Sequence, residues 1–226
     1  KKEEDSFALA REMVTIGNGA GRRTIAVISD MDQPLGYAVG NALEVKEAID
    51  TLNGAGPADF RELCLTLGSY MVVAAGKAAN KEEAREKLIE VIENGKALAK
   101  LAEFIEAQGG TKEEVYHPEL LPKAQYVQEI LSAEEGYISA IVCDEIGICS
   151  LILGGGRETK ESEIDLSVGL VLHKKKGDYV KKSESLATIH ANDLEKLEVA
   201  KKRFLAAYTF TTKEFEAEPL IRGIVE

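Results

Sequence analysis

The first 110 residues contain only one segment that predicts a β-strand, and this limits what the chain can form by itself. Residues 24–29 (Thr-Ile-Ala-Val-Ile-Ser) are apolar and β-rich without alternation, a pattern typical of a strand buried on both faces of a sheet. Because one strand does not make a sheet, we expect its partner strands to lie upstream or to come from elsewhere. Asn80 and Glu83 have the spacing of a reciprocal cap at the start of a helix. Apolar residues at helical spacing predict helices over 3–16, 38–52, 58–77, 81–93 and 96–107.

The second half of the chain has a different pattern. Residues 111–130 contain Pro118 and Pro122 without a sustained period, and we interpret them as a linker. The sequence after this segment predicts an α+β module of short strands. Strand patterns occur at 136–142, 166–172, 177–180, 186–189 and the C-terminal end. The pattern at 147–153 fits either a helix or a strand, and the pattern at 193–207 fits an amphipathic helix.

The composition disfavours several classes of protein. The chain has 45% hydrophobic and 30% charged residues, as in an ordinary globular protein rather than a disordered one. Its net charge of −11 disfavours a nucleic-acid partner. No apolar run is long enough to span a membrane, and the charged N-terminus lacks the apolar segment of a signal peptide. We therefore expect a cytoplasmic location and no membrane partner.

Two groups of residues are interpreted as structural. Cys64, Cys143 and Cys149 are odd in number and contain no CxxC pair, so we expect three small buried apolar residues in a reducing compartment. The lysines at 174–176 precede Gly177 and Asp178, which is typical of a solvated turn.

Two motifs suggest chemistry but have simpler interpretations. Residues 154–157 (Gly-Gly-Gly-Arg) could cradle phosphate, yet they lack the spacing of a known phosphate loop, and we favour a tight connection. Residues 177–189 have the G-D-x-V…L-x-x-I pattern of lipoyl- and biotinyl-type barrels, but no lysine stands at a hairpin tip, which argues against a carrier domain. His117, His173 and His190 lie outside any nucleophile motif, so no catalytic triad is predicted.

Residues 30–36 (Asp-Met-Asp-Gln-Pro-Leu-Gly) form a polar loop after the predicted strand. In open α/β sheets, ligands bind beyond this end of a strand. Asp30 and Asp32 would add charge there, and Glu44 and Glu47 lie near the start of the next helix. Loop carbonyls and a carboxylate are hard oxygen ligands that suit a hard cation. From the residues alone, an ion site and an ordinary solvated acidic loop both remain open.

Several segments lie in a specific order along nearly the whole chain, and the most specific are AVISDMDQPLG at 26–36 and GNALEV at 40–45. In these segments the sequence closely resembles the pyrimidine-nucleoside phosphorylase and thymidine phosphorylase family. The sequence departs from the family pattern at Ser183, where glycine is usual, at Gly155, where alanine is frequent, and over 208–216. The other matching segments are 47–49, 107–110, 121–122, 136–138, 153–157 and 164–169.

The resemblance implies a fold of the class α/β plus α+β. Residues 1–110 would be the C-terminal part of the phosphate-binding α/β domain, 111–133 a linker, and 134–226 a C-terminal α/β-hammerhead domain, which is barrel-sandwich-like. The family's K-H-S-T-G-G-V-G-D phosphate segment and its R-D-V-T…S-I…S-K-K base-binding segment do not occur here. Both lie upstream in the family, and the chain lacks an initiator Met, so we expect it to be the C-terminal part of the enzyme.

The resemblance also implies a pentosyltransferase of nucleoside salvage. Inorganic phosphate, the co-substrate, would attack the anomeric carbon of uridine or thymidine and release the base and a pentose 1-phosphate. The full-length enzyme is expected to be a homodimer. We assign no catalytic and no substrate-binding residue to this chain, and we expect the fragment alone to be inactive.

One family site carries over to this sequence. The family's structural potassium ion is held by backbone carbonyls at the positions of Leu35 and Ala38 and by a carboxylate at the position of Glu47, and the remaining ligands come from the phosphate loop. We expect this chain alone to hold potassium poorly, because a half-shell of ligands leaves the ion mostly hydrated.

The alternative hypothesis belongs to a different class. The chain would then be a stand-alone, non-catalytic module that uses the same fold for binding or assembly. The absent phosphate loop favours this hypothesis, whereas the absent initiator Met and the incomplete sheet favour a piece of an enzyme.

Overall fold

Strand β1 (Ala26–Ser29) has its partner at the opposite end of the chain. In this computed structural model, which describes residues 2–226, β1 pairs antiparallel with β9 (Ile221–Val225). Asp30 N–H extends this ladder to the carbonyl of Leu220 at 2.7 Å. All four residues of β1 are only partly buried, so the prediction of a strand buried on both faces is wrong. Helix α1 packs against β1, and within residues 2–226 the sheet that contains β1 has only two strands.

Two compact units share the chain, and neither is continuous in sequence. Unit 1 consists of the N-terminal segment up to Asp30, Ala58–Asn94 and Glu218–Glu226. Unit 2 consists of Met31–Pro57 and Gly95–Ala217. These borders differ from the domain limits expected after residues 110 and 133, which stay a prediction.

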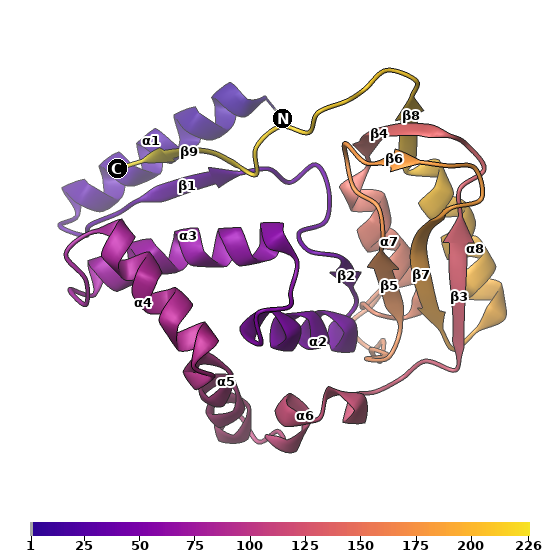
Figure 1. Cartoon of the computed structure of the whole chain (residues 1–226), viewed down its shortest axis with the longest axis horizontal. Helices are drawn as coiled ribbons and strands as arrows, with labels where there is room; N and C mark the ends of the chain where they lie inside the picture. Colours follow the sequence, from indigo (N-terminus) through magenta and orange to yellow (C-terminus); the bar gives the residue numbers. More distant parts are fainter. Residues whose placement is uncertain (1) are drawn as a thin grey trace. The chain divides into compact units, whose positions relative to one another are not determined.

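Unit 1 combines the β1–β9 ribbon with the helices α1 (Glu3–Gly19), α3 (Ala58–Ala74) and α4 (Lys81–Glu93). Helix α1 lies along the ribbon, and α3 packs against α4 (Figure 1). The predicted start of α4 is confirmed, because Asn80 Oδ1 accepts a hydrogen bond from Glu83 N–H at 2.9 Å. Glu83 Oε2 accepts from Ala79 N–H at 2.8 Å, so two backbone donors at this helix end are satisfied.

A shielded ion pair closes the end of the ribbon. Arg222 on β9 donates from Nη2 to Asp30 Oδ1 at 3.2 Å, and the two side chains are only 13% and 9% exposed. The same guanidinium pairs with Glu218. Loss of one partner from a pair this shielded would leave a poorly solvated charge, so we infer that it fixes β9 against the end of β1.

Unit 2 contains two antiparallel sheets, with the strand orders β2–β5–β7–β3 and β6–β4–β8 (Figure 1). Its strands are β2 (Ala38–Val39), β3 (Tyr126–Leu131), β4 (Gly136–Ile141), β5 (Gly169–Leu172), β6 (Tyr179–Val180), β7 (Ser185–Ala191) and β8 (Tyr208–Thr211). Its helices are α2 (Asn41–Leu52), α5 (Lys96–Ala107), α6 (Glu113–Tyr116), the 3-10 helix η1 (Pro118–Leu120), α7 (Cys143–Leu153) and α8 (Leu194–Ala206).

The main core of unit 2 lies where α7 and α8 pack against each other and against strands of the four-stranded sheet. Ile146 of α7, Phe204 of α8 and Ile189 of β7 are fully buried in it. A smaller cluster joins Ile49 of α2 to Val115 of α6. The expected mixed α and β architecture is confirmed, while the specific hammerhead description stays a prediction.

The sequence patterns misplaced two strands. Residues 126–131, assigned to the linker, form β3, which pairs with β7. Only Ile130 is fully buried in β3, so its solvated positions obscure the alternation. Ala38, assigned to a helix, lies in β2, because Gly40 has φ = 144° and α2 begins only at Asn41.

Two further interpretations need correction. The lysines at 174–176 are not freely solvated, since Lys174 pairs with Glu184 at 2.6 Å and Lys176 is only 12% exposed. None of the three cysteines forms a disulfide within residues 2–226, and only Cys149 is buried. Burial raises the pKa of the Cys149 thiol to about 11, which keeps it protonated at neutral pH.

The absence of an apolar span in the sequence agrees with the fold. Among the residues that the structure describes, no helix is both long and apolar enough to cross a bilayer.

Ser183 generates a prediction about stability. It is the one described non-glycine residue with positive φ, at 65°, in the turn closed by Glu184 N–H and Lys181 O at 3.0 Å. A side chain in this region costs about 1 kcal/mol, so Ser183→Gly should raise the free energy of unfolding by up to about 1 kcal/mol, the gain being limited by the flexibility of glycine in the unfolded chain. Urea denaturation measures this change.

Ser183→Ala is the matched control, because it removes the hydroxyl and keeps the Cβ. We expect it to leave the free energy of unfolding within about 0.5 kcal/mol of the parent, as for an ordinary surface substitution. Equal effects of alanine and glycine would show that backbone conformation is not the cause.

Candidate functional site

The candidate site is built by Glu47 on α2 and the loop that leads into β2. Glu47 Oε1 accepts hydrogen bonds from the backbone N–H of Tyr37 at 2.8 Å and of Ala38 at 3.0 Å. The carboxylate therefore holds the loop and the helix in one arrangement. Two of the three predicted cation ligands, Ala38 and Glu47, are in this way brought into direct contact, and Leu35 lies two residues before Tyr37.

The ladder between β2 and β5 orients the backbone of Ala38. Leu172 N–H donates to the carbonyl of Tyr37 at 2.8 Å, and Ala38 lies opposite Val171. Because antiparallel partners alternate between hydrogen-bonded and non-hydrogen-bonded pairs, Ala38 turns its N–H and its carbonyl away from β5. A carbonyl and a carboxylate on one side of an edge strand are oxygen ligands that suit a hard cation. The donor chemistry of Ala38 and Glu47 is compatible with such a cation, and the ion site itself stays a prediction.

Gly36 allows the close approach of Glu47. A Cβ at Gly36 would lie 2.1 Å from Glu47 Oε2, and the residue has φ = +67°. The backbone conformation favours glycine here, and a Cβ would displace the end of the Glu47 side chain from its position. The sequence alone did not show why a glycine is at position 36, because the reason involves the side chain of Glu47, eleven residues later.

Three segments singled out in the sequence meet beside the start of α2. Asn41 Nδ2 donates to the carbonyl of Gly155 at 2.9 Å, and Ala42 N–H donates to the carbonyl of Leu166 at 3.0 Å. A Cβ on Gly40 would lie 3.0 Å from the Cα of Gly169 and 2.4 Å from the carbonyl oxygen of Val168. The backbone at Gly40 is therefore in contact with the backbone of residues 168 and 169. The segments around 40–47, 153–157 and 164–169 therefore form one structural unit.

The glycine-rich segment is a helix end, as the simpler interpretation predicted. Gly154 is the left-handed C-cap of α7, and Gly155 N–H donates to the carbonyl of Ser150 at 2.8 Å. Its backbone is thus used to end a helix and to bind Asn41. This arrangement favours a tight connection over a phosphate cradle.

A polar network holds the segment before β5. Asp165 Oδ1 accepts from the N–H and hydroxyl of Ser167, and Asp165 Oδ2 accepts from Asn192 Nδ2 at 2.6 Å. Burial would raise the pKa of Asp165, but these hydrogen bonds outweigh it and lower the pKa below its ordinary value. The network therefore keeps a charged carboxylate next to the α2 contact. Sequence reasoning missed Asn192, whose partner lies 27 residues away.

The other acidic residues considered in the sequence have different partners. Asp30 pairs with Arg222 at 3.2 Å and Asp32 with Lys176 at 3.8 Å. Glu44 Oε1 accepts from Gly40 N–H at 2.9 Å and caps the start of α2. Among these four carboxylates, Glu47 alone accepts the amides of Tyr37 and Ala38.

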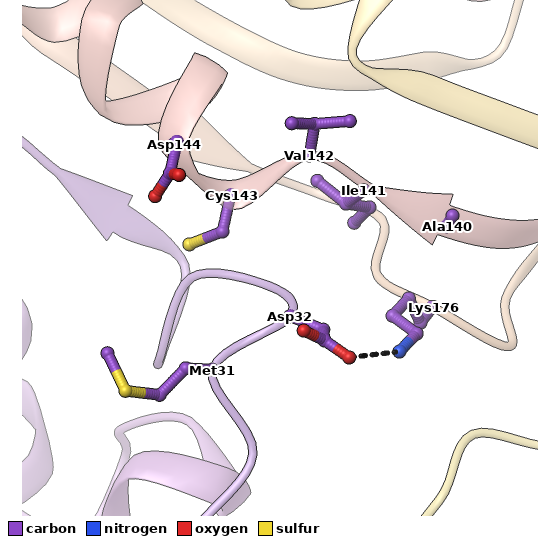
Figure 2. A pocket seen from close by; sticks show the side chains of 8 residues that line it. All are labelled: Met31, Asp32, Ala140, Ile141, Val142, Cys143, Asp144 and Lys176. Atoms are coloured by element: carbon purple, nitrogen blue, oxygen red, sulfur yellow. Dashed lines mark ion pairs between the residues drawn. The ribbon is translucent and has the colours of Figure 1, made fainter. Parts of the chain in front are cut away.

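A cavity of about 280 Å³ lies in unit 2, between the loop after β1 and the junction of β4 with α7. Asp32 and Lys176, which form an ion pair, line it together with Cys143 and Asp144 (Figure 2). Lys176 N–H also donates to Gln33 Oε1 at 3.0 Å. Lys176 thus binds the loop that leads to Glu47. The sequence alone did not indicate this contact, because Lys176 and Gln33 are 143 residues apart.

No catalytic triad is present within the part of the chain that the structure describes. His117 Nδ1 lies 3.1 Å from Glu119. His173 lies between the hydroxyls of Ser185 and Thr188, both at 3.0 Å, so no carboxylate orients its ring. Residues 2–226 also contain no group of three or more His, Cys, Asp or Glu side chains that could hold a metal ion. A cation site here therefore depends on carbonyl oxygens.

Comparison with known families finds two matches. The model described as "Pyrimidine nucleoside phosphorylase C-terminal domain" matches residues 137–211. The model described as "Glycosyl transferase family, a/b domain" matches residues 2–98. Together they cover both the Glu47 loop and most of the sheets of unit 2.

Several similar proteins have the same name. The pyrimidine-nucleoside phosphorylase of Staphylococcus haemolyticus (strain JCSC1435) is 60% identical over 192 residues, which are 85% of this chain and 44% of that protein. The pyrimidine-nucleoside phosphorylases of Bacillus subtilis (strain 168) and Geobacillus stearothermophilus are each 58% identical over 192 residues, again 85% of this chain and 44% of each relative. The chain thus spans less than half the length of these relatives.

The Glu47 contacts predict unequal effects of two substitutions. Glu47→Ala leaves two backbone N–H groups without their acceptor and should lower the free energy of unfolding by about 1–3 kcal/mol. Glu47→Gln keeps a carbonyl acceptor and should cost less. Amide hydrogen exchange at Tyr37 and Ala38 measures the local effect, and we expect faster exchange in the alanine variant than in the glutamine variant.

Glu103→Ala is a suitable control, because Glu103 forms only an exposed ion pair with Lys100 on α5. It should leave exchange at residues 37 and 38 unchanged. Equal protection of these amides in the parent and in Glu47→Ala would contradict the role of Glu47.

Proposed function

Since the chain belongs to the pyrimidine-nucleoside phosphorylase family, we propose that it is the C-terminal portion of an enzyme that cleaves uridine or thymidine with inorganic phosphate. The observation that carries this proposal is the 58–60% identity over 85% of the chain. It is supported by the way the segments resembling the family meet around Gly40 and Glu47.

The proposed reaction transfers a pentose from nitrogen to phosphate. A phosphate oxygen bonds to the anomeric carbon while the bond from that carbon to the base breaks, and the base leaves with the electron pair. Positive charge develops on the sugar, and a nearby phosphate stabilises it electrostatically. We propose that the phosphate loop and the base-binding residues belong to a part of the protein outside this chain, in keeping with relatives of more than twice the matched length.

The contribution of this chain is a rigid platform. We propose that the carbonyls of Leu35 and Ala38 and the carboxylate of Glu47 hold a potassium ion, which supplies a fixed positive charge that orders the phosphate loop. The support is the oxygen donor set and the hydrogen bonds from Tyr37 and Ala38 that orient Glu47. In this proposal the residues of this chain bind the ion and thereby orient the phosphate loop, and none of them is assigned to proton transfer.

The proposal also includes the oligomeric state, the location and the fold of the C-terminal part. We propose a homodimer in the cytoplasm, as the resemblance suggests. We also propose that residues 134–226 form the family's α/β-hammerhead, which the two antiparallel sheets of unit 2 support.

The first test is a comparison of two proteins. The 226-residue chain and the longer protein encoded with its upstream coding sequence are each incubated with uridine or thymidine and phosphate, and base release is followed by chromatography. We expect turnover by the longer protein and none by the chain alone. A start codon directly before Lys1, with no upstream frame for a phosphate loop, would overturn the enzyme proposal.

The second test concerns potassium. We expect only weak binding of potassium by the 226-residue chain, because part of the ligand shell is absent. In the longer protein, Glu47→Gln should raise the potassium concentration for half-maximal activity by about tenfold or more, since even partners of metal ligands contribute this much. Tight binding by the isolated chain in a calorimetric potassium titration would contradict the shared site.

A further inference from the structure

A second cavity in unit 2 is larger and more apolar than the one in Figure 2. It has a volume of about 510 Å³ and lies among α2, the segment around η1, β3 and β7. Leu121, Pro122 and Val127 form apolar parts of its wall. This volume and this type of lining are typical of pockets that bind small molecules.

His190 provides a polar group in this pocket. It lies on β7, between Val127 on β3 and Gly169 on β5. Unlike His117 and His173, its ring makes no hydrogen bond to any residue that the structure describes. Burial, and secondarily the charge of Lys46, lower the pKa of His190. A neutral imidazole can donate one hydrogen bond and accept another, so the ring is able to bind a polar ligand atom.

The charges at the pocket have the opposite sign to those of the protein as a whole. Lys46 and Lys123 both line it, and neither forms an ion pair among the described residues. Its one carboxylate, Glu119, lies 3.1 Å from His117 Nδ1. A backbone hydrogen bond and, among the smaller causes, the charge of Lys123 lower the pKa of Glu119, so Glu119 balances part of the positive charge. The chain carries a net charge of −11, so two ammonium groups against one carboxylate beside an apolar wall are a local excess of positive charge that favours an anion.

We propose that this pocket binds a small amphipathic anion, an apolar body with a single carboxylate. The apolar body contacts Leu121, Pro122 and Val127, and the carboxylate lies near Lys46 and Lys123 within reach of His190. A carboxylate is favoured over a phosphate, because no Arg lines the pocket to form the forked pair that phosphate recognition uses. The inference does not depend on the proposed phosphorolysis.

The test uses the 226-residue chain and 4-phenylbutyrate as the probe, followed by NMR of the His190 ring and of the Val127 amide. We expect saturable shifts at both positions and a rise in the pKa of His190, because a bound anion favours the charged imidazole. Lys46, Lys123 and Glu119 are the charged groups that line the pocket with it. The neutral amide of the same probe should bind at least about tenfold more weakly, as expected for loss of a charge-assisted contact.

Variants separate the charges from the apolar wall. Lys46→Gln and Lys123→Gln should each weaken binding of 4-phenylbutyrate by about two- to fivefold, the range for exposed charge pairs. Lys100→Gln on α5 is the matched control and should have no effect, since Lys100 pairs with Glu103 outside the pocket. Spectra of each variant outside the pocket show whether the fold is intact.

Three results would overturn the proposal. One is the absence of saturable shifts at His190 and Val127 up to millimolar probe. Another is equal binding of the neutral amide, which would mean that the lysines do not recognise charge. A third is tighter binding of phenyl phosphate than of 4-phenylbutyrate, which would show that the pocket is a phosphate site.

Discussion

The two hydrogen bonds from the amides of Tyr37 and Ala38 to one oxygen of Glu47 organise the candidate site. They tie an irregular loop to the first turns of α2, and they place a carboxylate beside the backbone of an edge strand. A buried or half-buried backbone N–H needs an acceptor, and Glu47 supplies it for two residues at once. Gly36 favours the arrangement, because a side chain there would displace the carboxylate from its position.

The contacts around α2 spread this order to the rest of unit 2. The backbone contact between Gly40 and Gly169 joins the loop to β5, and Asn41 joins it to the end of α7. Lys176 and Gln33 join it to the turn before β6. A loop held from three sides by backbone groups has little freedom to rearrange, which suits the role of a rigid platform that we propose for it.

Much of the helical structure was predictable, and the reason is local. Asn80 and Glu83 satisfy backbone donors within one turn, and α8 begins where Asp193 caps it. The strands were less predictable. β3 shows little alternation because both of its faces have exposed positions and only Ile130 is fully buried. Ala38 belongs to a strand because Gly40 interrupts the helical pattern.

The candidate site was predictable only through the resemblance to a family. The residues alone could not distinguish Glu47 from Asp30, Asp32 and Glu44, because all are carboxylates near one loop. Their partners separate them: Arg222 for Asp30, Lys176 for Asp32, and the amide of Gly40 for Glu44. The pocket around His190 had no sequence signal at all, since its walls come from segments that are far apart in the chain.

The sequence by itself determined the helices, their caps, the glycines that turn the chain and the family to which it belongs, because these depend on neighbouring residues or on the order of residues. Only the tertiary structure decided that β1 pairs with a strand about 195 residues later, that the lysine run is bound, and that one carboxylate of four accepts the loop amides. These features depend on which distant groups meet, and a linear pattern does not contain that information.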